Sequence, residues 1–219
     1  MPRARGLSIQ SLITILSCPL GELTVRIGAL YTDSMVEPAR KPYMTAEELF
    51  VVSSDDCKYE LIAGTLVRMS PTGATHGAVS ARVAWLLVEY VEAHRLGVVC
   101  GAETGFILRR HPDTVRAPDV SFVSKDRVAA AGQPESYWPL APDLAVEVLS
   151  PSDRRADVQA KLEDYFRAGS RLVWVIDPSA RTVVVHRSPS DSTRLTEADE
   201  LTGGTVLPSF ASPVRRLFA

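Results

Sequence analysis

The run Leu172-Val-Trp-Val-Ile176, which ends at Asp177-Pro178, places the tightest limit on how this chain folds. Every residue in the run is apolar, so a strand formed here has no polar face to turn toward water. This pattern predicts a central strand that is covered on both faces. Helical and strand-like patterns alternate along the chain around it. We therefore expect a mixed α/β (α+β) domain with one curved β-sheet and helices packed against it.

The composition is that of a globular chain, since 46% of the 219 residues are apolar and 23% are charged. The 24 Lys and Arg residues against 26 Asp and Glu residues give a formal net charge of −2, which excludes a broad basic coat for nucleic acid. No apolar run is long enough for a membrane helix. The three cysteines form no CxxC pair, so we expect free thiols in a reducing cytoplasm rather than a zinc or redox motif.

Residues 1–40 differ in texture from the rest and are expected to be a poorly ordered extension. Met35 and Met44 lie just before the patterned region, so a start assigned too far upstream would account for the extension. Arg3 and Arg5 precede a weakly apolar stretch, which is the alternative pattern of a secretory signal. Polar residues interrupt that stretch, and no small-x-small site follows it closely. The working domain is expected to be residues 41–219.

Local signals place most elements of that domain. Thr45-Ala-Glu-Glu48 is a capping box and predicts a short helix to about Val52. Ala63-Gly64 predicts a hairpin turn between strands at Tyr59–Ile62 and Thr65–Met69. The remaining expected elements are a helix capped by Thr75 that reaches about His94 with Gly97 at its end, strands at Val98–Cys100, Gly105–Leu108, Val115–Val123 and Leu144–Leu149, a helix over Arg154–Ala168, strands at Leu172–Ile176 and Thr182–His186, two or three ragged strands, and a turn at Val214–Phe218.

Several catalytic motifs are absent from the sequence. It contains no GxSxG nucleophile elbow, no Walker A motif, no complete dinucleotide fingerprint and no HExxH pair. The chemistry therefore has to come from another set of residues. Acidic residues within strand-like runs, together with one lysine, are the candidates that remain.

Asp119 and Glu147 each lie in an otherwise apolar run. A lone carboxylate in such a run is costly unless it is paired, binds a cation or reaches solvent at a strand end. Pro118 marks an edge, a bulge or a bend just before Asp119. Asp143 competes for the role of Asp119, but along one strand it lies too far from Glu147 for one metal ion.

Lys161 follows on the next predicted helix and borders its apolar stripe, so its long side chain can extend over the sheet toward Glu147. The alternative is a solvated lysine paired with Asp157 or Asp164 along the same helix.

These residues belong to motifs that occur in a fixed order over about residues 41–218: Tyr59-Glu60-Leu61-Ile62-x-Gly64, His76-Gly77, Pro118-Asp119-Val120-Ser121-Phe122-Val123, Glu147-Val148-Leu149-Ser150-Pro151-Ser152, Lys161 with Tyr165 and Ala168-Gly169, Trp174-Val175-Ile176-Asp177-Pro178, and the ending Leu201-Thr202, Leu207-Pro208 and Leu217-Phe218. In this order they resemble the Uma-two family of predicted endonucleases. That resemblance implies the PD-(D/E)XK, restriction-endonuclease-like fold. Its αβββαβ core has a mixed curved sheet flanked by helices, here with an added N-terminal helix–hairpin and C-terminal strands.

The resemblance also implies a set of catalytic residues. Asp119 matches the aspartate of the PD element, and Glu147 matches the acidic residue of the (D/E)XK element. Leu149 stands where the superfamily has its lysine, and Lys161 on the following helix is the residue that matches within this family. Asp119, Glu147 and the backbone carbonyl of Val148 would hold Mg²⁺, or Mn²⁺ in its place.

Glu60 matches a further family glutamate at the same site, and His76 matches a histidine with an accessory role. In this scheme the metal ion activates water and polarises the scissile phosphate, while Lys161 orients that water or stabilises the negative charge that develops on the phosphate.

The implied substrate is DNA, and the implied assembly is a homodimer, without an organic cofactor. A catalytically silent nuclease-fold protein that binds nucleic acid or a protein is the main alternative, and a purely structural α/β protein is the third. The predictions place Trp85 and Trp174 in the core. Candidate groove charges, each with solvated surface as its alternative, are Arg82, Arg109, Arg110, Arg116, Arg154 and Arg155.

Overall fold

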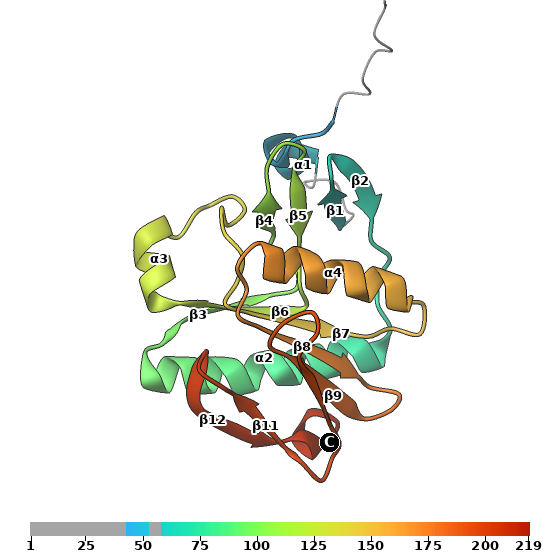
Figure 1. The fold of residues 1–219 in the computed structure, drawn as a ribbon, viewed down its shortest axis with the longest axis vertical. Helices are drawn as coiled ribbons and strands as arrows, with labels where there is room; N and C mark the ends of the chain where they lie inside the picture. Colours follow the sequence, from blue (N-terminus) through green and yellow to red (C-terminus); the bar gives the residue numbers. More distant parts are fainter. Residues whose placement is uncertain (1–42, 53–57) are drawn as a thin grey trace, which may run out of the picture. The chain divides into compact units, whose positions relative to one another are not determined.

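The computed structural model describes residues 43–52 and 58–219, so the expectation for residues 1–40 lies outside it. Figure 1 labels most of the elements of the described part. They are α1 (Ala46–Val52), β1 (Tyr59–Ile62), β2 (Thr65–Arg68), α2 (Ala74–His94), β3 (Gly97–Gly101), β4 (Phe106–Arg109), β5 (Thr114–Arg116), β6 (Val120–Ser124), α3 (Lys125–Ala131), β7 (Leu144–Val148), α4 (Arg155–Arg167), β8 (Leu172–Asp177), β9 (Thr182–His186), β10 (Ser192–Leu195), β11 (Glu200–Gly203), β12 (Leu207–Pro213) and the short 3₁₀ helix η1 (Val214–Leu217).

A six-stranded mixed sheet with the order β10-β9-β8-β7-β6-β3 is the centre of the fold. β7 and β8 are parallel, and the other neighbouring pairs are antiparallel. The apolar run of β8 lies inside this sheet and is buried from Leu172 to Ile176, as predicted. The elements of this sheet and its two long helices follow one another as α2, β3, β6, β7, α4 and β8, which is the expected αβββαβ order.

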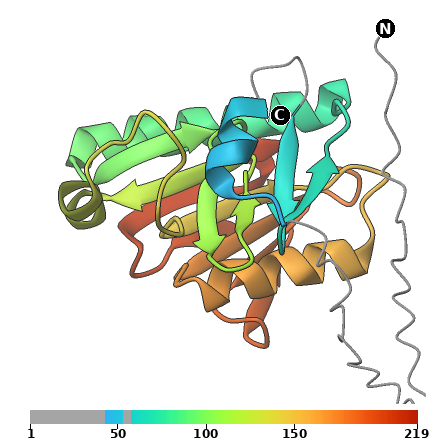
Figure 2. The same ribbon diagram turned by 90° about the horizontal axis from the view of Figure 1, so that it is seen from above.

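The two long helices cover opposite faces of the six-stranded sheet, as Figures 1 and 2 show. Val146 of β7 and Trp174 of β8 pack with the buried stripe of α2, whereas Val173 and Val175 of β8 pack with Leu162 of α4. Alternate residues of one strand therefore serve two cores, which explains why the strand sequence has no polar face. No helix in the described part of the chain is long and apolar enough to cross a membrane.

A second sheet, β2-β1-β5-β4, carries α1, and β11 pairs with β12 in a third. The expectation of a single curved sheet was therefore wrong. The capping box of α1 forms: the Thr45 amide donates to the Glu48 carboxylate at 2.8 Å, and the Glu48 amide donates to Thr45 Oγ1 at 3.2 Å. The β1–β2 turn also forms, with positive φ at Ala63 and Gly64, as a two-residue hairpin requires.

The run Val115–Val123 was predicted to be one strand, but it forms β5 and β6, which belong to different sheets. Pro118 lies at the break, where its missing N–H interrupts the ladder. α3 was not predicted because none of its residues is buried, so it has no apolar stripe to reveal it.

α2 ends at His94 as predicted, but its capping residues differ from the prediction. Gly73 rather than Thr75 is the N-cap, and Arg95, with φ of 53°, is the C-cap instead of Gly97. Trp174 is buried as expected, but Trp85 is 54% exposed because it lies off the buried stripe of α2. The guanidinium of Arg216 lies 5.6 Å from the centre of the Trp85 ring.

Candidate active site

The chain brings Asp119 and Glu147 to adjacent positions on neighbouring strands. β6 and β7 are antiparallel with Val120 opposite Val146, so the next register position places Asp119 opposite Glu147. The Asp119 amide donates to the Val146 carbonyl at 3.0 Å, and the Asp119 carboxylate accepts the Val148 amide at 2.8 Å. Asp119, the residue before β6, is thus held against the end of β7, where Glu147 lies.

Glu147 is 7% exposed, and α4 supplies a partner for each of its oxygens. Lys161 Nζ lies 2.7 Å from Glu147 Oε2, and the Tyr165 hydroxyl donates to Glu147 Oε1 at 2.7 Å. Lys161 and Tyr165 are four residues apart and therefore share one helix face. Lys161 accordingly pairs across to the sheet rather than with Asp157 or Asp164 on its own helix.

The electrostatics of this pair show an excess of negative charge. Burial raises the pKa of Glu147, and the neighbouring carboxylates of Asp119 and Glu60 raise it further, so that Lys161 does not fully compensate. Burial alone would lower the pKa of Lys161. The carboxylates of Glu147, Glu60 and Asp119 have the larger effect and raise that pKa. The lysine is therefore held as an ammonium ion, and additional positive charge at this place is favourable.

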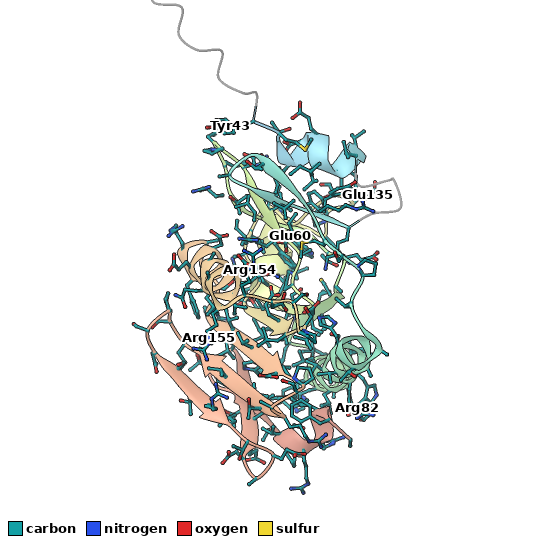
Figure 3. All side chains as sticks on the ribbon, turned by 90° about the vertical axis from the view of Figure 1, so that its right-hand side faces the viewer. Tyr43, Glu60, Arg82, Glu135, Arg154 and Arg155 are labelled. Atoms are coloured by element: carbon teal, nitrogen blue, oxygen red, sulfur yellow. The ribbon has the colours of Figure 1, made fainter. Side chains whose placement is uncertain are left out.

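Glu60 reaches the same region from β1 and is 1% exposed. Its Oε2 accepts Arg116 at 2.8 Å, its Oε1 accepts the Ala117 amide at 3.2 Å, and Lys161 Nζ lies 4.0 Å away. Burial alone would raise the pKa of Glu60, but Lys161 and Arg116 lower it. Arg116 also binds Asp164, at 2.7 Å, so this predicted groove arginine is instead a buried part of the site. Figure 3 labels Glu60 at its place on the ribbon.

His76, in the first turn of α2, contacts Asp119 from the other side. Its Nε2 lies 3.2 Å from Asp119 Oδ2, and its Nδ1 lies 3.4 Å from Ser80 Oγ. Hydrogen bonding to Asp119 is the main factor that raises the pKa of His76, with smaller contributions from Asp153 and the Val148 backbone. Burial would raise the pKa of Asp119, but His76 and the Val148 amide lower it, so Asp119 is an ionised carboxylate.

A cleft of about 370 Å³ opens over these groups and is lined by Asp119, Glu147, Val148, Lys161 and His76. The predicted set is therefore brought together, with Glu60 beneath the cleft rather than in its lining. None of the six candidate groove arginines lines it. Figure 3 labels three of them: Arg154 and Arg155 at the start of α4, and Arg82 on α2.

Two basic residues that the sequence reasoning missed, Lys58 and Arg68, line the cleft instead. The predicted hairpin was the sequence feature that could have revealed them. A two-residue turn at 63–64 fixes a register that brings the start of β1 against the end of β2. The partnership of Tyr165 with Glu147 was also missed, because Tyr165 fits an apolar stripe.

The donor set at this cleft suits a hard divalent cation. Asp119, Glu147 and the Val148 carbonyl offer oxygen ligands, which Mg²⁺ prefers while keeping several waters. The carboxylates of Glu147, Glu60 and Asp119, which together raise the pKa of Lys161, favour positive charge at this place. Within residues 43–52 and 58–219, no group of three or more His, Cys, Asp or Glu side chains is placed to hold a metal ion. Any such ion would therefore rely on two carboxylates, a carbonyl and water.

The fold is similar to that in the crystal structure of "a putative nuclease belonging to DUF820" from Anabaena variabilis ATCC 29413, with a TM-score of 0.68 and coverage of 80% of this chain and 97% of that one. The two sequences are 19% identical, so this likeness concerns the fold alone.

The chain belongs to the family described as "Uma2: Putative restriction endonuclease", whose model matches residues 46–215. The family resemblance in the sequence is thereby confirmed. Among curated proteins, none matches this chain.

Proposed function

We propose that this protein is a metal-dependent endonuclease that hydrolyses phosphodiester bonds in DNA. The observation that carries the proposal is the meeting of Asp119, Glu147 and Lys161 in one cleft. Asp119 and Glu147 come from adjacent strands, and the lysine ammonium lies 2.7 Å from Glu147. Carboxylates from two strands with a neighbouring lysine suit metal-assisted phosphodiester hydrolysis, because they offer oxygen ligands and a cation side by side.

In this proposal Asp119, Glu147 and the Val148 carbonyl hold Mg²⁺, or Mn²⁺ in its place. When bound, the ion would polarise the scissile phosphate and lower the pKa of a water ligand. Lys161 carries a full positive charge and has N–H donors beyond the one given to Glu147. It orients the attacking water or stabilises the negative charge on the phosphate.

The surrounding residues hold these groups in place. Tyr165 fixes the carboxylate of Glu147, and Glu60 lies beside Lys161 while Arg116 neutralises it from behind. His76 holds Asp119 at 3.2 Å. Such outer contacts keep reacting groups in position without reorganisation during the reaction.

One observation favours the alternative of a catalytically silent binding module. Leu149 occupies the position where the superfamily motif has its lysine, and both oxygens of Glu147 already have partners. The two functions are separated by a cleavage assay on supercoiled plasmid with Mg²⁺ or Mn²⁺. The wild type is compared with Asp119→Asn, Glu147→Gln and Lys161→Met. The control is Glu163→Gln, which changes an exposed carboxylate on α4.

We expect the wild type and the Glu163 variant to cleave at the same rate, and the three site variants to fall to background. Equal cleavage by all five proteins would refute the assignment, because a contaminant would then be the source. A wild type that does not cleave with either metal ion, but binds DNA with an affinity that falls steeply with salt, would support the binding module. We further propose a homodimer, for which the check is the mass in solution by light scattering.

A further inference from the structure

Two of the basic residues that line the cleft, Lys58 and Arg68, lie at the open end of the β1–β2 hairpin. Arg68, the last residue of β2, is paired with Tyr59, and the Met69 amide donates to the Lys58 carbonyl at 2.9 Å. Both side chains line the cleft that contains Asp119 and Glu147. The hairpin pairing thus brings the two segments that carry these cations side by side, and both side chains line the cleft.

Lys58 is fixed beside the catalytic aspartate. Its Nζ donates to the Ala117 carbonyl at 3.3 Å, and its charge contributes to the lowered pKa of Asp119. Glu60, two residues further on, accepts the amide of the same Ala117. An ammonium group has three donors, so Lys58 keeps N–H groups for a further partner.

Arg68 is exposed, and its guanidinium has no hydrogen bond or ion pair with any other residue that the structure describes. Arg110 and Arg116 differ from it because both form ion pairs with carboxylates. An arginine that lines a cleft and has no partner for its planar fork among the described residues can bind phosphate oxygens in pairs.

Residues 150–153 form another part of the lining, where the Asp153 carboxylate accepts the Ser150 amide at 2.7 Å and the Ser150 and Ser152 hydroxyls lie 2.8 Å apart. This part offers an anion and hydroxyl groups, whereas the hairpin offers two cations. A polyanionic chain in the cleft is therefore attracted to the hairpin cations.

We propose that Lys58 and Arg68 bind the backbone phosphates of the nucleic-acid strand next to the scissile bond, so that this strand follows the β1–β2 hairpin. This inference rests on the proposed nuclease function and names the residues that seat its substrate. It would also allow a chain of net charge −2 to bind DNA, because two local cations would take the place of a broad basic surface.

The test is the salt dependence of DNA binding in EDTA, with a fluorescein-labelled 30-base-pair duplex and fluorescence anisotropy. The variants are Arg68→Gln, Lys58→Gln and the charge-keeping Lys58→Arg. Arg194→Gln is the matched control, because Arg194 is an exposed arginine on β10 outside the cleft. Thermal unfolding checks that each variant is folded. Lys58 is half-buried, whereas Arg68 is exposed, so the Arg68 variant tests the proposal at a position where folding is not at risk.

Each lost phosphate contact should reduce the slope of log affinity against log salt by about 0.9. A fourfold rise in salt should then weaken Arg68→Gln and Lys58→Gln about 3.5-fold less than the wild type. Lys58→Arg and Arg194→Gln should keep the wild-type slope. If the wild type binds and cleaves DNA but Arg68→Gln and Lys58→Gln keep its slope, this inference is wrong and the nuclease function stands. A wild type that neither binds nor cleaves DNA overturns both.

Discussion

Replacing Arg116 with methionine tests the buried charge network beneath the cleft. The Arg116 side chain is 5% exposed and donates to Glu60 Oε2 at 2.8 Å and to Asp164 Oδ2 at 2.7 and 3.0 Å. Methionine keeps much of the apolar side chain but removes the cation. Glu60, which is 1% exposed, then stays buried with Lys161, 4.0 Å away, as its remaining cation.

The expected cost follows from the burial of this pair. Removing one partner of a buried ion pair typically costs about 3–5 kcal/mol, because the other charge is left uncompensated. That is a large part of the roughly 5–15 kcal/mol by which domains are stable. For a domain of this size, each kcal/mol corresponds to about 2–4 °C in Tm, so Arg116→Met should lower Tm by roughly 6–20 °C. Urea titration and thermal unfolding, both followed by circular dichroism at pH 7, measure the change.

Two further variants make the result specific. Glu60→Gln combined with Arg116→Met should cost less than the sum of the single changes, with an interaction energy of about 0.5–3 kcal/mol, because the pair is lost only once. Arg167→Met is the control, since its side chain is 63% exposed and its contacts with carboxylates are 3.8–3.9 Å long; it should cost less than about 1 kcal/mol. A loss below 1 kcal/mol for Arg116→Met, or strict additivity in the double variant, would refute the reasoning.

Three other changes probe the site and its scaffold. Tyr165→Phe removes the hydroxyl that donates to Glu147 at 2.7 Å, so Mn²⁺ affinity measured by calorimetry should fall about 10–100-fold, and an unchanged affinity would exclude a positioning role. Gly97→Ala should lower the urea midpoint, because the glycine has φ of 154° and an added Cβ would overlap the backbone carbonyl of Val123 on the neighbouring strand β6. Gly77→Ala is its counterpart in α2: this position faces open space, so the change should raise stability by up to about 1 kcal/mol. Burial would raise the pKa of Asp143, but a backbone amide and two arginines lower it, so its carboxylate contributes stability that is present above about pH 4 and is lost as the pH falls through the native pKa. The urea midpoint of Asp143→Asn should therefore decline less than that of the wild type between about pH 5 and pH 2.5, and parallel declines would contradict this.

Elements whose signals lie within a few residues were predicted correctly. The capping box at Thr45 and the turn at Ala63-Gly64 each depend on local backbone chemistry, and both form as expected. The run Val115–Val123 failed because its apolar pattern is continuous, and only the partners of β5 and β6 assign the two halves to different sheets. No local pattern encodes that choice, since it depends on which strands lie next to each half.

At the site, the cost of burying a carboxylate was the informative signal. Asp119 and Glu147 stood out because a charge within an apolar run needs a partner, and the antiparallel register places the two opposite each other. Lys161 was chosen through the family resemblance, since periodicity alone left a solvated lysine equally open. Lys58 and Arg68 were missed because charged residues at strand ends are common, and only the folded structure shows that both line the cleft.

The net charge of the chain proved a poor guide to what an incoming phosphate would meet. Many of the charged groups cancel at short range. Arg171 pairs with buried Asp143, and Arg181 pairs with Glu197, so neither arginine offers much field beyond its partner. The cleft differs because three carboxylates (Asp119, Glu147 and Asp153) and three cations (Lys58, Arg68 and Lys161) line it together, and Arg68 has no partner among the described residues. In our proposal a phosphodiester would contact Arg68 and a metal ion held by Asp119 and Glu147, so the metal ion and the hairpin cations would have to act together for the chain to hold DNA.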